Sequence, residues 1–195
     1  DDMIRLFGLE PEIYVGDNVP GRVIAIGHPR TIVVLDRIIL AEPEAPRRFA
    51  LGWAFEGICG GYASILQLGE KQRNELASLM RSLFAPEDSR NGPTNEFVKT
   101  LPVTALEIMR RHEGEFQDYD MEEWMDGMNA SARRAGLLAC DDLAAAARML
   151  ALLSDETIGE HSTGLGKVFC GEDLFQYQVR DRYEQLRTAL SRPKT

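Results

Sequence analysis

The residues of this chain that could do chemistry are few, and their spacing does not favour catalysis. His112 begins the run His112-Glu113-Gly114-Glu115, but a helical zinc motif needs a second His four residues on, where the chain has Phe116. His161 follows Glu160 in a polar stretch. A shared metal site of His112, His161 and nearby carboxylates stays open as an alternative. In that case the protein would be a metal-dependent hydrolase with a non-standard site.

No serine or cysteine stands in a known nucleophile motif. Ser64, Ser131 and Ser154 lack the flanking glycines of a Gly-x-Ser-x-Gly elbow. Cys170 could begin a helix, whose dipole would lower the pKa of its thiol, but we interpret it as a half-buried residue at a loop–helix junction. The run Gly164-Leu165-Gly166-Lys167 is followed by Val, where a phosphate-binding loop needs Ser or Thr. We expect a connecting loop there.

An acidic run interleaved with aromatic side chains, between residues 113 and 126, is the best candidate for a binding surface. It lacks the Asp-x-Asp-x-Asp-Gly pattern and the distal Glu of a calcium-binding EF-hand. Acidic runs are usually solvated faces, whereas exposed aromatic residues are typical of protein interfaces. We therefore predict a partner-docking element made of Phe116, Tyr119, Glu122, Glu123 and Trp124.

The composition excludes several classes of protein. The chain has 195 residues, of which 44% are hydrophobic and 27% charged, as in globular proteins with a sizeable core. A net charge of −9 and the lack of a basic stripe argue against nucleic-acid binding. No stretch reaches the roughly 18 apolar residues that a membrane span needs, and no signal peptide is visible.

Cysteine usage indicates a reducing compartment. Cys59, Cys140 and Cys170 are far apart and form no Cys-x-x-Cys pair, so neither a zinc ribbon nor a disulfide framework is expected. We expect Cys59 and Cys140 to be buried among small apolar residues, and the protein to be cytoplasmic.

Strand signals are confined to the N-terminal part of the chain. The β-branched runs 22–26 and 31–35 flank a Gly-His-Pro-Arg turn and predict a hairpin, and a short strand is expected over 12–15. Beyond residue 43 the apolar periodicity is helical. The expected helices cover 47–68, 70–84, 94–111 with an interruption at Pro102, 122–150 with a break at 140–142, and 171–191.

These elements predict an α+β fold that is predominantly α. A small N-terminal β-hairpin or meander is followed by a helical bundle. We expect one domain over 1–195, with a β-rich part over 1–42 and a helical part over 43–195, and we expect it to belong to a larger multi-domain protein.

The segment 49–58 reads Phe-Ala-Leu-Gly-Trp-Ala-Phe-Glu-Gly-Ile and follows the predicted hairpin. This arrangement resembles the M48-type (Ste24/HtpX-like) zinc metallopeptidases, in which a hairpin leads into a helix Phe-x-Leu-Gly-His-Glu-x-x-His. In that motif the two His bind zinc and the Glu activates water. Here the three motif positions hold Trp53, Ala54 and Gly57, none of which can ligate a metal or transfer a proton.

A second motif extends the resemblance. The run 132–136, Ala-Arg-Arg-Ala-Gly, matches the family signature Ala-Asp-Arg-x-Gly, except that Arg133 replaces the Asp. The family's third zinc ligand is a Glu four residues before that Asp, a position held by Asn129. The next run, 137–146, resembles a bacterial subgroup of such domains that accompanies tetratricopeptide repeats. The resemblance covers roughly residues 5 to 190, and two short motifs carry it.

The resemblance implies a zincin-like fold whose metal site is lost while its packing glycines are kept. The leading hypothesis is a catalytically inactive domain, with no cofactor, that serves as a structural or protein-interaction module in a larger bacterial protein. Its partner would be another protein or a flanking helical-repeat domain. A peptide or small-molecule sensor that uses the vestigial cleft is a further alternative. We also predict a Glu56–Arg133 pair in place of the metal.

Overall fold

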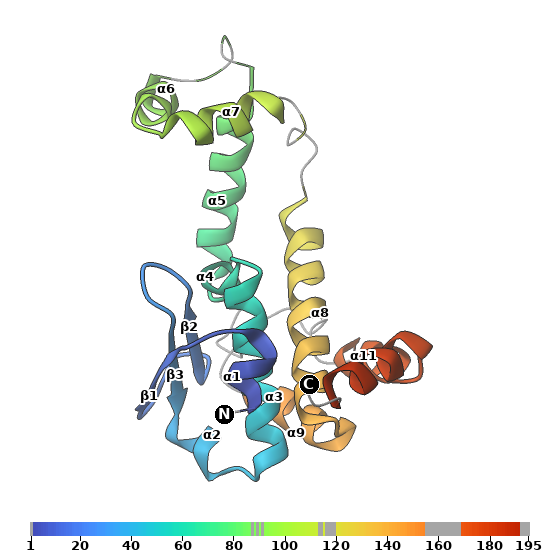
Figure 1. Ribbon diagram of the computed structural model, residues 1–195. Helices are drawn as coiled ribbons and strands as arrows, with labels where there is room; N and C mark the ends of the chain where they lie inside the picture. The colour runs from blue at the N-terminus through green and yellow to red at the C-terminus, as the bar shows by residue number, and fades with distance from the viewer. Residues whose placement is uncertain are drawn as a thin grey trace. The chain divides into compact units, whose positions relative to one another are not determined.

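The protein is mostly helical, with a small three-stranded sheet near its N-terminus (Figure 1). This computed structural model describes residues 2–86, 88, 90, 92–112, 115, 120–154 and 169–191. The predicted α+β, predominantly α fold class is confirmed. The backbone groups into two compact units, residues 1–67 with 127–195, and residues 68–126. Each unit is described by itself.

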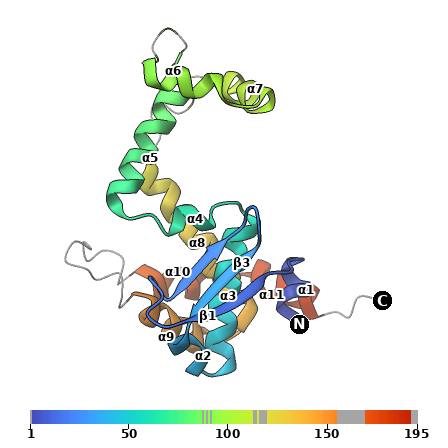
Figure 2. The same cartoon turned by 90° about the vertical axis from the view of Figure 1, so that its left-hand side faces the viewer.

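The sheet consists of β1 (Glu12–Gly16), β2 (Val23–Ile26) and β3 (Ile32–Asp36), with β3 in the middle (Figure 2). β2 and β3 are antiparallel, as the hairpin prediction requires. β1 lies parallel to β3, with Glu12 opposite Ile32, so the three strands do not form a simple antiparallel meander. The sheet therefore has two edge strands, β1 and β2.

The helices of the first unit follow the predicted order, but the single helix expected over 47–68 is wrong, because the chain breaks at Gly60 and Gly61, where Gly61 has a positive φ of 73°. They are α1 (Asp2–Phe7), α2 (Arg37–Ala41), α3 (Glu44–Cys59), α4 (Ala63–Leu66), α8 (Met121–Cys140, of which the part from Gly127 on belongs here), α9 (Leu143–Ser154), α10 (Phe169–Gln178) and α11 (Asp181–Ser191). The predicted break between residues 140 and 142 is confirmed, and Asp142 caps α9 by accepting a hydrogen bond from the Ala145 N–H at 3.0 Å. The single helix expected over 171–191 is wrong, because the chain breaks at Val179 and Arg180.

α3 is the centre of the hydrophobic core. It is buried on several faces, with Phe49, Ala50, Ala54 and Phe55 all nearly inaccessible to solvent. The sheet covers one side of α3, while α8 and α9 lie on the opposite side (Figures 1 and 2). The inward residues of the sheet and of α9 complete the core: Val23, Ala25, Val33, Leu35, Ala146 and Met149.

Polar contacts connect the two C-terminal helices to α8 and to Asp141, the residue that follows it. The Arg134 guanidinium lies 2.5 Å from the Asp173 carboxylate of α10. On α11, the Tyr183 hydroxyl and the Arg187 guanidinium donate to the Asp141 carboxylate at 2.7 and 2.6 Å. Burial is the main cause that raises the pKa of Tyr183, so this hydroxyl stays protonated and donates at ordinary pH.

The second unit is helical. It contains α5 (Glu70–Leu83), α6 (Gly92–Lys99), α7 (Val103–Arg111) and the first turns of α8, and the predicted interruption at Pro102 is confirmed. Several of its apolar side chains are exposed: Leu79, Phe97, Val103 and Ile108. None of the helices within the described residues is long and apolar enough to cross a membrane.

Asp36, at the end of β3, links this strand to the segment that contains Val19 and to the start of α2. Its buried carboxylate accepts hydrogen bonds from the N–H groups of Val19 and Ile38, both at 2.9 Å. The bond from Ile38 caps α2 and is the main cause that lowers the pKa of Asp36, with Val19 and the nearby Arg22 charge acting in the same direction.

We predict that Asp36→Asn destabilises the protein at neutral pH and that the difference from the unchanged protein narrows in acid. A carboxyl whose folded pKa is lowered stabilises the fold above its unfolded pKa of about 3.9, and this stabilisation is lost as the pH falls through the folded value. Melting temperatures of both proteins from pH 7 to pH 2 measure the effect. A difference in melting temperature between the two proteins that stays constant over this pH range would contradict the stabilising role of the Asp36 charge.

Candidate functional site

The two helices that carry the peptidase-like motifs pack directly against each other. A Cβ atom added to Gly52 of α3 would lie 2.7 Å from the Ala139 Cβ of α8 and 3.0 Å from the Gly136 Cα. A Cβ atom added to Gly136 would lie 2.9 Å from the Phe49 ring. Such distances leave no room for a side chain at either glycine. The glycines that the resemblance identified as packing residues therefore lie at the closest approach of α3 and α8.

A side-chain contact also joins the two helices at this crossing. The Arg48 Nε donates to the Ala139 backbone carbonyl at 2.8 Å. Figure 1 shows that α3 and α8 run in opposite directions.

The three motif positions of α3 are packed in the interior. Ala54 is 1% exposed, and Trp53 is half-buried against the hydrophobic core. A Cβ atom added to Gly57 would lie 3.2 Å from the Ala63 Cα, so this position faces α4 and not a cavity. These positions pack helices together, and their side chains offer neither a metal ligand nor a proton-transfer group.

The two motif positions of α8 lie partly exposed. Asn129 and Arg133 are half-buried. In the described part of the chain, no hydrogen bond or ion pair joins either of them to Trp53, Ala54 or Gly57. The structure thus brings the two helices together through their glycines and does not assemble a polar site from the five positions.

The predicted pair of Glu56 with Arg133 is wrong. The Glu56 carboxylate instead accepts a hydrogen bond from the Tyr62 hydroxyl at 3.3 Å, and no ion pair between Glu56 and Arg133 is present among the described residues. Burial and the neighbouring Glu56 raise the pKa of Tyr62. A partner six residues away in the chain satisfies Glu56, so the interhelical arginine is not needed.

The histidines and thiols do not form a reactive site in the described residues. His112 Nδ1 lies 2.7 Å from Glu115 Oε2, at the end of α7, and His161 lies outside the described residues. No group of three potential metal ligands occurs within the described residues. Burial is the main cause that raises the pKa of the Cys59 and Cys140 thiols, which disfavours the nucleophilic thiolate.

The two described cysteines differ in exposure. Cys140 is half-buried, whereas Cys59 is exposed, so the expected burial of Cys59 is wrong. Cys59 is the last residue of α3, and its thiol donates to the Phe7 carbonyl at 3.6 Å. The side chain of Cys170 lies outside the described side chains.

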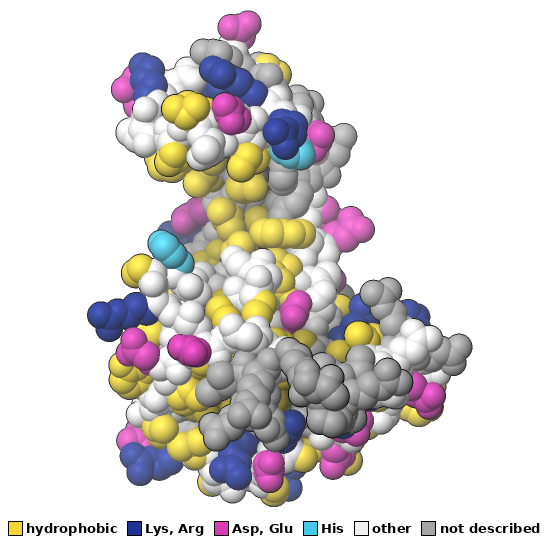
Figure 3. All heavy atoms as spheres, in the orientation of Figure 1, with side chains coloured by type: hydrophobic (Ala, Val, Ile, Leu, Met, Phe, Trp, Pro, Cys, Tyr) yellow, Lys and Arg dark blue, Asp and Glu magenta, His cyan; other side chains and the backbone are white. Residues whose placement is uncertain are grey.

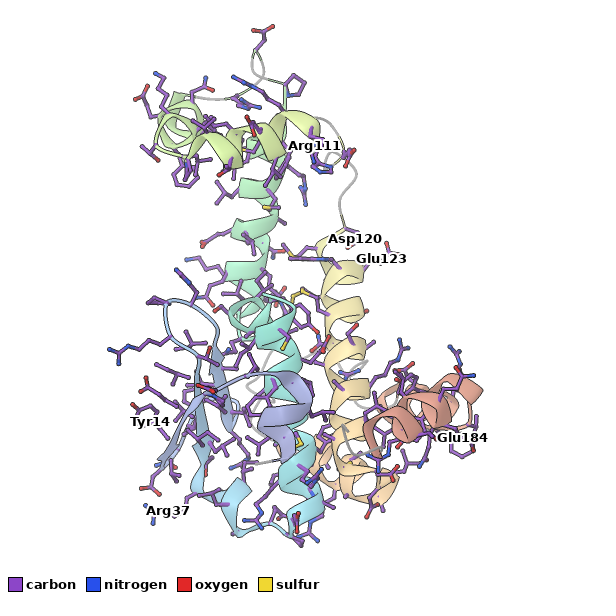
Figure 4. The ribbon with its side chains drawn as sticks, in the orientation of Figure 1. Tyr14, Arg37, Arg111, Asp120, Glu123 and Glu184 are labelled. Atoms are coloured by element: carbon purple, nitrogen blue, oxygen red, sulfur yellow. The ribbon has the colours of Figure 1, made fainter. Side chains whose placement is uncertain are left out.

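The predicted docking element is only partly described. Glu122, Glu123 and Trp124 are exposed in the first turns of α8, as a docking surface requires. Figure 4 shows Glu123 at this end of the helix. The Asp120 carboxylate accepts hydrogen bonds from the N–H groups of Glu122 and Glu123 at 2.8 and 3.3 Å, so it caps the helix. Carboxylates here also interact favourably with the helix dipole. Phe116 and Tyr119 lie outside the described residues, and the docking role stays a prediction.

A shallow pocket of about 500 Å³ lies along α5. It is lined by Glu70, Lys71, Asn74, Glu75 and Ser78, all from that one helix. None of the five motif positions takes part in it. This pocket therefore does not lie at the positions that the sensor alternative would use.

Comparisons of this chain with protein families, with curated proteins and with solved structures found no match.

We predict that Gly136→Ala and Gly127→Ala, the same substitution in the same helix, change stability in opposite directions. At Gly136 the new methyl group collides with Phe49, and overpacking should destabilise the fold by about 1–3 kcal/mol. At Gly127 nothing lies within 4 Å, so the higher helix propensity of Ala should stabilise the fold by up to about 1 kcal/mol. Urea unfolding measures both. Equal stabilisation by the two changes would contradict the close crossing of α3 and α8.

Proposed function

We propose that this chain is a catalytically inactive, zincin-like domain that serves as a structural or protein-interaction module in a larger, cytoplasmic bacterial protein. The observation that carries the proposal is the crossing of the two motif helices at Gly52 and Gly136. In the metallopeptidases that the sequence resembles, the two corresponding helices hold zinc. In this chain the same helices keep the small residues needed for packing, and side chains without catalytic capacity hold the ligand positions.

The packing of α3 supports a structural role for the motif region. Ala54 and Gly57, at positions where the peptidases have a general base and a zinc ligand, are both buried. Placing polar groups there without partners would cost stability. Small apolar residues at both positions instead favour a close-packed core, which is what a scaffold needs.

Exposed apolar and acidic side chains support the interaction part of the proposal. Trp124 is 37% exposed next to Glu122 and Glu123. Aromatic residues on the surface are enriched in protein interfaces. We propose that this element meets a protein partner or a flanking helical-repeat domain.

Zinc analysis of the purified protein tests the proposal. After incubation with zinc and removal of the excess, we expect no stoichiometric zinc by elemental mass spectrometry, and no hydrolysis of unstructured protein substrates. The physical reason is that the motif positions supply no imidazole, thiolate or carboxylate.

His112→Ala and His161→Ala are the matched variants for this measurement, because they remove the two residues of the alternative metal site. Stoichiometric zinc that both variants abolish would contradict the proposal and favour the metal-dependent hydrolase.

A further inference from the structure

The free edge of β1 is unusually open. Ile13, Tyr14 and Val15 are 46%, 51% and 49% exposed, although all three are apolar or aromatic and stand in the middle of a strand. Natural edge strands are commonly protected by a lysine, a proline or a bulge. β1 has no lysine or proline, and its pairing with β3 is regular from Glu12 to Gly16.

The backbone of β1 leaves hydrogen-bonding groups unused on this edge. The Glu12 N–H donates to the Thr31 carbonyl at 2.8 Å, so Glu12 faces β3. Since neighbouring residues of a strand direct their N–H and C=O groups to alternate sides, Tyr14 also faces β3, while Ile13 and Val15 face away. No hydrogen bond to the outward groups of Ile13 or Val15 comes from the residues that the structure describes.

The other edge of the same sheet, β2, is partly covered by another element of the chain. On β2 the outward carbonyl of Ala25 accepts a hydrogen bond from the Gln67 side chain at 2.8 Å, and the same amide donates to Ala63 at 2.7 Å. α4 and its C-terminal Gln67 therefore cover part of the β2 edge. The β1 edge therefore presents more exposed apolar side chains to a partner than the β2 edge does, within the described part of the sheet.

The apolar character continues across the outer face of the sheet. The register places Tyr14, Val34 and Ile24 side by side on the face that points away from α3. None of these three side chains is buried. Figure 3, in the orientation of Figure 1, shows hydrophobic side chains next to acidic and basic ones on the flank where the sheet lies.

The charges at the two ends of β1 are complementary to a second copy of the same edge. Arg30 and Glu12 pair at 3.6 Å at one end, and Arg37 and Asp17 pair at 2.7 Å at the other. Figure 4 shows Tyr14 and Arg37 on this outer flank. In an antiparallel pairing, Glu12 and Arg30 of one copy would meet Arg37 and Asp17 of the other. In a parallel pairing each charge would meet its own like, which is unfavourable.

We propose that two copies of this chain associate through antiparallel pairing of their β1 strands. A twofold axis at Tyr14 sets Ile13 of each copy opposite Val15 of the other. Every outward N–H of Ile13 and Val15 then meets an outward C=O, and the two sheets join into one. The interface is isologous, since one surface patch contacts its own copy. This inference does not depend on the loss of catalysis, so its failure would leave the proposed function in place.

Sedimentation equilibrium over a range of protein concentrations tests the pairing. We expect a reversible dimer. Ile13→Lys, which places a charge in the seam, and Val15→Pro, which removes an outward N–H that β3 does not use, should each raise the dimer dissociation constant about tenfold or more. Ile26→Lys is the matched control, because Ile26 is 37% exposed on β2 and lies outside the seam. It should leave the dissociation constant unchanged.

A charge exchange keeps the test decisive if the seam variants fold poorly. The double change Asp17→Arg with Arg37→Glu keeps the pair within each copy but sets like charges opposite Arg30 and Glu12 of the other copy. The double change Glu12→Arg with Arg30→Glu does the same at the other end. Each variant alone should dimerise more weakly, and a mixture of the two should restore tight association as a heterodimer.

Three results would overturn the inference. A wild-type protein that stays monomeric up to its solubility limit excludes the second copy. A dimer that resists Ile13→Lys and Val15→Pro as well as Ile26→Lys uses another surface. A charge-exchanged mixture that associates no more tightly than its components excludes the antiparallel orientation.

Discussion

The close approach of α3 and α8 is the constraint on which the first unit depends. Two helix backbones can approach this closely only where neither carries a side chain. Gly52 on α3 and Gly136 on α8 meet this requirement. The Phe49 ring then fills the space beside Gly136, and Arg48 reaches the Ala139 carbonyl. Because α3 also supports the sheet on its other side, the position of the strands follows from the same crossing.

In the proposed function, this constraint separates the packing of the two helices from any metal chemistry. Packing energy depends on volume and shape, whereas metal binding depends on a few ligand atoms held at set distances. Ala54 and Gly57 are buried, and Trp53 packs against the hydrophobic core, so all three positions take part in packing. In the proposed function, the two glycines of the crossing serve the stability of the fold and not a reaction.

Local signals in the sequence predicted most helix boundaries. One error, the missed break at Gly60 and Gly61, also carries a local signal, whereas the other errors involve contacts between distant parts of the chain. Pro102 and the Asp pair after Cys140 mark breaks that the structure has, because both act on the backbone where they stand. The break at Val179 and Arg180 has neither proline nor glycine, and α11 beyond it bonds to Asp141 through side chains that lie far from it in the sequence. The parallel pairing of β1 likewise depends on a strand far along the chain, which a short apolar run does not identify.

In the candidate site, too, some features could be predicted from the sequence and others could not. The glycines of the helix crossing could be recognised from two motifs, because backbone approach demands one residue type. The partner of Glu56 could not be predicted from the sequence. A tyrosine six residues away and an arginine on another helix can both donate a hydrogen bond to a carboxylate. The open edge of β1 was also missed, although its signal was present in three consecutive strand-forming residues without a protecting charge.

Gln67 has a consequence that reaches beyond the sheet it covers. In the proposed dimer, pairing through β1 stops at two copies, because two sheets that join leave no β1 strand for a third. If the bond from Gln67 to Ala25 were broken and α4 moved aside, each copy would offer two edges, and pairing could continue without end into a filament. In the proposed dimer, the Gln67 amide would thus help to keep the association finite.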